Sequence, residues 1–141
     1  MGHSVVKPEV IATRLGRLRE YVAILKSLRK YPRDRFVNDP VIRGSAERYL
    51  HLAIECCLDL GNHVIADRGL RKPQDYKEIF LIHGEAKILP SAFAKKIAPM
   101  GGFRNILVHD YLRVDPIVVR KFLQTHLTDF ERFAKAFAKY L

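Results

Sequence analysis

The strongest constraint on the fold is a seam of mainly apolar residues at the end of the sequence. Asp115-Pro116 supplies a helix cap and a first-turn proline, and seam residues then recur at three- and four-residue steps. The seam, which includes one histidine, consists of Val119, Phe122, Leu123, His126, Leu127, Phe130, Phe133, Ala134, Phe137 and Leu141. This spacing places the whole set on one helix face, which needs a core to pack against. We therefore expect one helix over residues 116–141.

Earlier parts of the chain have the same periodicity. We expect a break or bend at 99–102, because proline removes a helical donor and each glycine costs about 1 kcal/mol of helix stability. No segment shows the alternation that is typical of a strand. The sequence therefore predicts an all-α fold, an antiparallel bundle of four to five helices. Helical spacing covers residues 8–31, 38–66, 76–84 and 90–111.

Size and composition fit one globular domain over residues 1–141. Hydrophobic residues make up 48% of the chain, which is enough to build a core and excludes a disordered protein. Cys56 and Cys57 are adjacent in a helical segment where their side chains diverge, so a disulfide framework is excluded. No apolar run approaches the roughly 20 residues that span a bilayer, and the N-terminus has no apolar signal core. We therefore expect a cytoplasmic protein with no membrane partner.

The chain is strongly basic, with 25 Lys and Arg residues against 15 Asp and Glu residues, a formal net charge of +10. A positive field on a small domain favours polyanionic partners. The usual phosphate-loop, dinucleotide-binding, zinc-protease and serine-hydrolase motifs are absent from the sequence. A metal site on one helix face is conceivable, but no second Glu-x-x-His element completes it, so we expect no metal and no cofactor. Its ligands would be His51, Glu55, Asp59 and His63.

Residues 104–111 concentrate polar chemistry in two helical turns. On a helix, Asn105 and His109 lie one turn apart on the same face, and Arg104 flanks that face closely enough to reach the same phosphate. Phe103 is expected to point towards the core. A guanidinium, an amide and an imidazole on one face favour phosphate chemistry.

This segment resembles the HEPN superfamily and, within it, the HepT-like toxins that pair with a minimal nucleotidyltransferase (MNT) antitoxin. The shared pattern is Arg-x4-His-x-Tyr, supplied here by Arg104, His109 and Tyr111, and Asn105 after the arginine also fits. Looser similarities are the helix number, the chain length and the Ala46-Glu47-Arg48-Tyr49 and Val114-Asp115 segments. The resemblance implies a single HEPN-like domain.

The resemblance implies a metal-independent endoribonuclease, in which the ribose 2′-hydroxyl attacks the adjacent phosphorus and leaves a cyclic phosphate. The implied catalytic residues are Arg104, Asn105 and His109. An imidazole can exchange a proton near neutrality, as a general base or acid must. A guanidinium can hold the phosphate oxygens and stabilise the charge that develops on them, while Asn105 orients the phosphate or the imidazole.

In-line cleavage is best served by a base and an acid, yet the motif has one histidine per chain. A two-fold homodimer built across the motif would bring two copies of Arg104 and His109 into one cleft. The resemblance further implies that the cognate MNT-type antitoxin transfers AMP to Tyr111. The added negative charge and bulk would exclude RNA phosphate and silence the toxin.

Other interpretations of the motif remain open at this point. The basic bundle could be a non-catalytic module that binds nucleic acid, nucleotide or an acidic partner, or a structural subunit with no effect on RNA. In a purely structural interpretation, His109 binds a free carbonyl at a helix end and Tyr111 anchors the core. We expect His83 and His126 to be core or edge histidines. Because one sequence does not show which helices face the motif, no catalytic role is assigned to Glu47, Arg48, His51, Glu55, Asp59 and Asp110.

Overall fold

The helices are arranged so that their apolar faces meet, as the sequence predicts. The computed structural model describes residues 7–140, apart from the side chain of Tyr111. Within this range the chain has eight α-helices, two short 3-10 helices and no strand, so the prediction of an all-α bundle is confirmed. The elements are α1 (Pro8–Ser27), η1 (Leu28–Lys30), α2 (Arg33–Asn38), α3 (Pro40–Arg68), α4 (Tyr76–Glu85), α5 (Ser91–Ile97), α6 (Pro99–His109), η2 (Tyr111–Arg113), α7 (Pro116–Thr125) and α8 (Leu127–Ala138).

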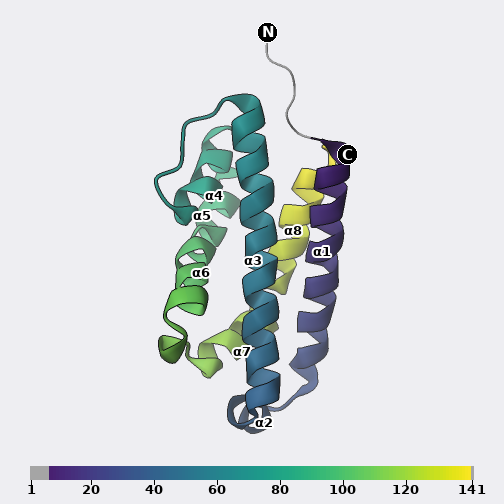
Figure 1. Cartoon of the computed structure of the whole chain (residues 1–141), viewed down its shortest axis with the longest axis vertical. Coiled ribbons are helices and arrows are strands. Elements are labelled where there is room, and N and C mark those ends of the chain that lie inside the picture. Colours follow the sequence, from purple (N-terminus) through teal and green to yellow (C-terminus); the bar gives the residue numbers. More distant parts are fainter. Residues whose placement is uncertain (1–6, 141) are drawn as a thin grey trace.

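The longest helix, α3, forms the centre of the bundle. It runs antiparallel to α1, with α8 beside α1 on one side and α4, α5 and α6 on the other (Figure 1). The short helices α2 and α7 close one end of the bundle, where they contact each other. Because α3 packs against both α1 and α6, it can present a polar stripe to α6 while its apolar residues fill the core.

The core combines aliphatic residues of α1 and α3 with aromatic residues of α8. Leu15 and Leu25 of α1 are fully buried, and Phe133 and Phe137 of α8 stack with ring centroids 4.4 Å apart. Within the described residues, most of the predicted seam of the last helix faces this core; Leu141 lies outside the described range. Burial of large apolar side chains is the main favourable contribution to folding.

The predicted helix starts are confirmed by their capping hydrogen bonds. The Asp39 side chain accepts from the backbone N–H groups of Val41 and Ile42, and Asp115 accepts from the N–H of Ile117. At the other end of α3, Gly69 adopts φ 62°, a left-handed conformation that favours glycine at a helix end. Both capped helices therefore begin where the sequence indicates.

The single helix predicted over 116–141 is wrong, because it is divided at His126 into α7 and α8. His126 has φ −120° and ψ 2°, which is not helical. Its Nδ1 lies 3.2 Å from Asp129 Oδ2, and Lys96 Nζ of α5 donates to Asp129 Oδ1 at 3.1 Å. A contact with another helix therefore coincides with the break.

Two other boundaries differ from the sequence prediction. The expected break at 99–102 occurs one residue earlier, at Ala98, and Gly101 and Gly102 lie inside α6. The first helix ends at Ser27 rather than near Tyr31, and the unpredicted α2 follows. These differences leave the order of the predicted helical segments unchanged.

Several single-residue expectations are confirmed in the described part of the chain. His83 is fully buried, and its Nε2 lies 2.8 Å from the Gly61 carbonyl oxygen, so it is a core histidine. Cys56 and Cys57 are free thiols; burial raises the pKa of Cys56 to about 11 and raises that of Cys57 well above its usual value. Between residues 7 and 140, no helix has the length and hydrophobicity needed to cross a membrane.

Candidate active site

The polar motif lies on α6, and a close contact between helices fixes the start of this helix. Pro99 occupies the first turn of α6, where its missing N–H costs no hydrogen bond. A Cβ atom at Gly101 would lie 2.5 Å from the backbone nitrogen of Lys77 and 2.7 Å from the carbonyl carbon of Tyr76. Only a glycine therefore allows α6 to approach the start of α4 this closely.

Hydrogen bonds in the preceding connection fix the start of α4. The guanidinium of Arg71 binds both oxygens of Glu85 at 3.0 and 2.8 Å and Glu78 at 2.9 Å. The Asp75 side chain accepts from the backbone N–H of Glu78 at 2.9 Å and caps the helix. Tyr76, the first residue of α4, is thereby placed beside α6.

Arg104 is the centre of the candidate site. Its Nε forms an ion pair with Glu55 Oε1 of α3, and its guanidinium carbon lies 4.6 Å from the centroid of the Tyr76 ring. Its Nη1 donates to Asn105 Oδ1 at 3.3 Å and lies 3.5 Å from His109 Nε2. The side chain is only 15% exposed, so the guanidinium is held in one orientation by a carboxylate and an aromatic ring.

The structure brings together three of the four residues that the sequence singles out. Asn105 and His109 are exposed on the same face of α6, one turn apart, and both contact Arg104. Since a guanidinium only donates hydrogen bonds, the Nε2 atom of His109 that faces it is suited to accept a proton. Tyr111, the fourth residue, begins η2 two positions after His109, and its side chain is not among the described atoms.

Glu55 and His51 of α3 complete the site, and the sequence did not assign them to it. Glu55 Oε1 binds Arg104, and His51 Nε2 lies 3.4 Å from the same oxygen. Both belong to the polar stripe of the second predicted helix, at a four-residue spacing. That stripe was the available signal, but the sequence does not show that it faces α6.

The other polar residues to which the sequence assigned no catalytic role have different surroundings. Asp59 pairs with Arg14 of α1 at 3.4 Å, and burial raises its pKa. Arg48 and Glu47 line a shallow hollow between α3 and α6, and burial also raises the pKa of Glu47. Asp110 pairs with Arg113 at 3.2 Å. These contacts place Asp59 and Asp110 outside the Arg104 cluster.

No group of three or more His, Cys, Asp and Glu side chains among the described residues is arranged to hold a metal ion. Two ligands of the conceivable metal site are engaged elsewhere, Glu55 with Arg104 and Asp59 with Arg14. The cluster around Arg104 is instead suited to bind a phosphate and to move a proton. The cluster offers a guanidinium and an amide for the first task and an imidazole for the second.

Comparison with known proteins identifies the family. The family model described as "Ribonuclease HepT-like" matches residues 18–137, which include α6 and its motif. The chain belongs to the HepT-like ribonuclease family. This confirms the resemblance noted from the Arg-x4-His-x-Tyr pattern and the expectation of an enzyme that cleaves RNA.

Individual relatives of this HepT-like protein have related functions. It is 29% identical to the tRNA nuclease HepT of Aphanizomenon flos-aquae over 136 residues, covering 96% of this chain and 92% of the relative. It is 30% identical to the mRNA nuclease HepT of Shewanella oneidensis over 100 residues, covering 71% and 75% respectively. The two relatives are named for different RNA classes.

A solved structure confirms the HEPN-like architecture. The tri-AMPylated Shewanella oneidensis HEPN toxin in complex with MNT antitoxin superposes with a TM-score of 0.82 at 24% sequence identity. The match covers 90% of this chain and 95% of the toxin. At this identity the likeness is one of fold.

Proposed function

We propose that this HepT-like ribonuclease is the toxin of a toxin–antitoxin pair and that it cleaves RNA without a metal ion. The proposed catalytic residues are Arg104, Asn105 and His109. The observation that carries the proposal is the position of Arg104 Nη1, which contacts both Asn105 Oδ1 and His109 Nε2. Glu55 and Tyr76 hold the other side of the same guanidinium. A phosphate bound by this guanidinium would therefore lie beside the imidazole.

The reaction follows from these positions. Nε2 of His109 accepts the proton of the ribose 2′-hydroxyl, and the 2′-oxygen forms a bond to the adjacent phosphorus. The bond from phosphorus to the 5′-oxygen breaks, and this oxygen takes a proton from a protonated imidazole. The products end in a cyclic phosphate and a 5′-hydroxyl. Arg104 stabilises the negative charge that develops on the non-bridging oxygens, and Asn105 orients the phosphate or the imidazole.

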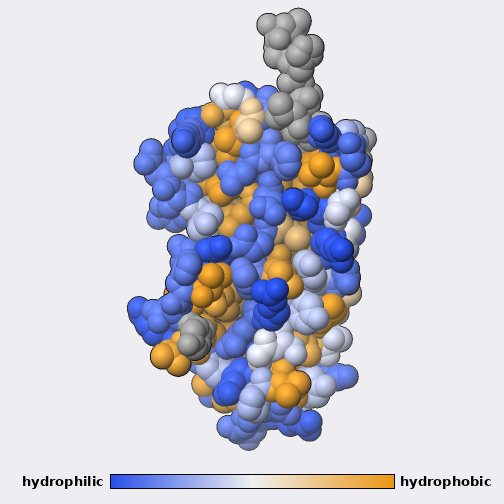
Figure 2. All heavy atoms as spheres, in the orientation of Figure 1, coloured by the Kyte–Doolittle hydropathy of each residue, from blue (hydrophilic) through white to orange (hydrophobic). Residues whose placement is uncertain are grey.

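The acid in this scheme is supplied by His109 of a second copy of the chain. Hydrophobic patches interrupt the mainly hydrophilic surface on the face that carries α3 and α6 (Figure 2). Near the motif in sequence, Leu112 is 88% exposed, and at the start of α3 Val41 is 76% exposed. An isologous contact built across the motif would bring two motifs into one cleft and cover apolar side chains next to it in sequence, such as Leu112. The homodimer is thus the proposed active form.

The proposed partner is an MNT-type nucleotidyltransferase antitoxin that transfers AMP to Tyr111. Tyr111 follows His109 by two residues, so an AMP group there adds negative charge next to the phosphate site. The tri-AMPylated state and the antitoxin complex of the Shewanella oneidensis toxin support this proposal. The cytoplasm, where thiols stay reduced, suits the free Cys56 and Cys57 and is the proposed location.

The direct test incubates the full-length wild type with RNA in excess chelator and analyses product ends on a denaturing gel. We expect cleavage to cyclic-phosphate ends, and a loss of rate of about 100-fold or more for Arg104→Ala. Lys135→Ala, which removes one positive charge from an exposed residue of α8, is the matched control and should cleave like wild type.

Two results would contradict the proposal. Cleavage that the chelator abolishes would contradict metal independence. RNA binding without cleavage by the unmodified wild type would instead favour the non-catalytic binding module. Mass spectrometry of Tyr111 belongs in the same experiment, because an AMPylated preparation is expected to be silent.

A further inference from the structure

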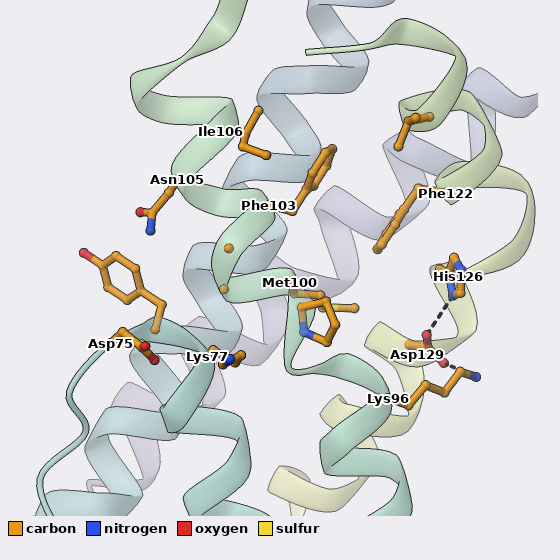
Figure 3. A pocket seen from close by; sticks show the side chains of 15 residues that line it. Asp75, Lys77, Lys96, Met100, Phe103, Asn105, Ile106, Phe122, His126 and Asp129 are labelled. Carbon is orange, nitrogen blue, oxygen red and sulfur yellow. Dashed lines mark hydrogen bonds and ion pairs between the residues drawn. The ribbon is translucent and has the colours of Figure 1, made fainter. Parts of the chain in front are cut away.

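A groove begins beside the candidate active site and follows the N-terminal half of α6 (Figure 3). Its volume is about 730 Å³, within the range of about 300–1,000 Å³ that is typical of small-molecule sites. We call it the α6 groove. Its apolar floor is formed by Met100, Phe103 and Ile106 of α6 and Val118 and Phe122 of α7.

One end of the α6 groove is continuous with the candidate active site. Tyr76 and Asn105 line the groove, and both contact Arg104, through the ring face at 4.6 Å and the amide oxygen at 3.3 Å. Asn105 and Asp75 lie at this end in Figure 3. A molecule whose phosphate is held by Arg104 would therefore have its adjoining part at the mouth of the groove.

At the other end of the groove, a buried carboxylate holds two side chains that can donate hydrogen bonds. Asp129 is only 3% exposed and binds Lys96 Nζ at 3.1 Å and His126 Nδ1 at 3.2 Å. Since a carboxylate only accepts, Nδ1 carries a proton, which leaves Nε2 of His126 as the second ring nitrogen for a ligand. Lys96 is half-exposed and has further N–H groups to donate. This end is therefore a built polar site.

Between the two ends the groove offers aromatic surface. The Phe103 and Phe122 rings are both partly buried and are almost parallel, with an interplanar angle of 13°. The His126 ring lies 5.1 Å from Phe122. Aromatic faces of this kind stack on nucleobases regardless of sequence.

The geometry points to the α6 groove as the binding site for one nucleotide of the RNA substrate, next to the phosphate held by Arg104. The base lies on the apolar floor, and Lys96 and His126 bind its polar edge or its other phosphate. This inference rests on the proposed function, since it is the Arg104 site that places RNA at the mouth of the groove. It assigns the groove a role in substrate affinity and not in the chemical step.

The hydrogen-bond donors of this groove favour a nucleotide over an apolar protein segment. Its carboxylates are both engaged, Asp129 by Lys96 and His126, and Asp75 by the backbone N–H of Glu78. Lys77 lines the groove as well, so Lys77 and Lys96 both bring N–H donors to it, on a chain whose net charge is +10. An apolar helix of a partner would leave these donors without acceptors, whereas a nucleotide supplies acceptors for them.

The test compares two neighbouring residues of α7 in the full-length protein. Val118 lines the groove and is 50% exposed, whereas Ile117 does not line it and is 44% exposed. Val118→Glu puts a negative charge in the groove, and Ile117→Glu puts the same charge beside it. Because both side chains are half-exposed, both variants should fold, which circular dichroism checks.

Binding is measured by fluorescence anisotropy with an oligoribonucleotide that wild type cleaves, made uncleavable by one 2′-deoxy residue at the cleaved position. We expect Val118→Glu to raise the Kd about tenfold, the effect expected for loss of one stacked base, and Ile117→Glu to leave it unchanged. An abasic residue on one side of the 2′-deoxy position should weaken wild-type binding by a similar factor. The same abasic residue should raise the Kd of Val118→Glu little further, because both changes remove the same contact between the base and the groove.

Cleavage assays separate a failure of this inference from a failure of the proposed function. If Arg104→Ala loses cleavage but Val118→Glu and Ile117→Glu bind RNA alike, the function stands and the groove assignment is overturned. If Arg104→Ala cleaves at the wild-type rate, yet the losses from the abasic residue and from Val118→Glu are not additive, the groove binds a nucleotide and the proposed catalytic site is wrong. If Val118→Glu changes only the oligomeric state, with no dependence on the base, the groove is a protein interface and the inference is wrong.

Discussion

Replacing Gly101 by alanine tests the contact that places α6 against α4. The added Cβ would lie 2.5 Å from the Lys77 nitrogen, about 0.9 Å inside the 3.4 Å at which ordinary contact begins. Its neighbours are backbone atoms, which cannot rotate away, so the two helices must separate. Overpacking of this kind costs about 1–3 kcal/mol.

Gly102→Ala is the matched control, because a Cβ at Gly102 meets no atom within 4 Å. Both substitutions gain about 1 kcal/mol from the higher helix propensity of alanine. The difference between the two variants therefore isolates the packing cost. We expect Gly102→Ala to be as stable as wild type or more stable, and Gly101→Ala to be less stable than Gly102→Ala by about 1–3 kcal/mol.

Urea denaturation followed by circular dichroism measures the free energy of unfolding of each variant. The two values can be compared if the free energy falls with urea concentration at the same slope in both variants. Gly101→Ala should also cleave RNA more slowly, because the separation moves Tyr76 away from the Arg104 guanidinium. Equal stability of the two variants, or a more stable Gly101→Ala, would refute the close approach of α6 to α4.

Three further predictions concern the site, the core and regulation. Glu55→Gln removes the charge that anchors Arg104 and should lower the cleavage rate about tenfold, whereas Asp59→Asn, whose partner is Arg14, should not; equal rates would contradict the anchoring role. Burial lowers the pKa of His83, so the unfolded state binds a proton at this imidazole more readily than the folded state does. The contribution of neutral His83 to the free energy of unfolding is therefore complete above about pH 6.5 and is lost as the pH falls below it. Thermal melts of His83→Gln should therefore depend less on pH between about pH 7 and pH 5 than those of wild type, and parallel curves would exclude this role. Tyr111→Phe lacks the hydroxyl that accepts AMP and should stay active with antitoxin and ATP; silencing by the same modification, seen by mass spectrometry, would overturn the assignment.

Local chemistry was enough to predict where most helices begin. Asp39 and Asp115 are N-caps followed by proline, and this signal depends only on neighbouring residues. Helical periodicity likewise identified Phe133 and Phe137 as core residues, because it depends on spacing along a single helix. The family motif then placed the candidate site at residues 104–111, most of which lie in α6.

What the sequence did not predict depends on contacts between distant segments. The break at His126 coincides with a bond to Asp129, which also binds Lys96 more than 30 residues earlier. From the sequence, Gly101 was expected to break a helix. In the structure it lies inside α6, at the point where the backbone of α4 approaches it. Glu55 is 49 residues from Arg104, and only the packing of α3 against α6 shows that they meet.

The central claim is that His109 performs proton transfer during RNA cleavage. It is tested most directly by measuring RNA binding and cleavage side by side for wild type and His109→Ala, both unmodified at Tyr111. The account predicts that His109→Ala binds the same RNA with a Kd close to that of wild type and loses cleavage by about 100-fold or more. Cleavage by His109→Ala at the wild-type rate would contradict the account.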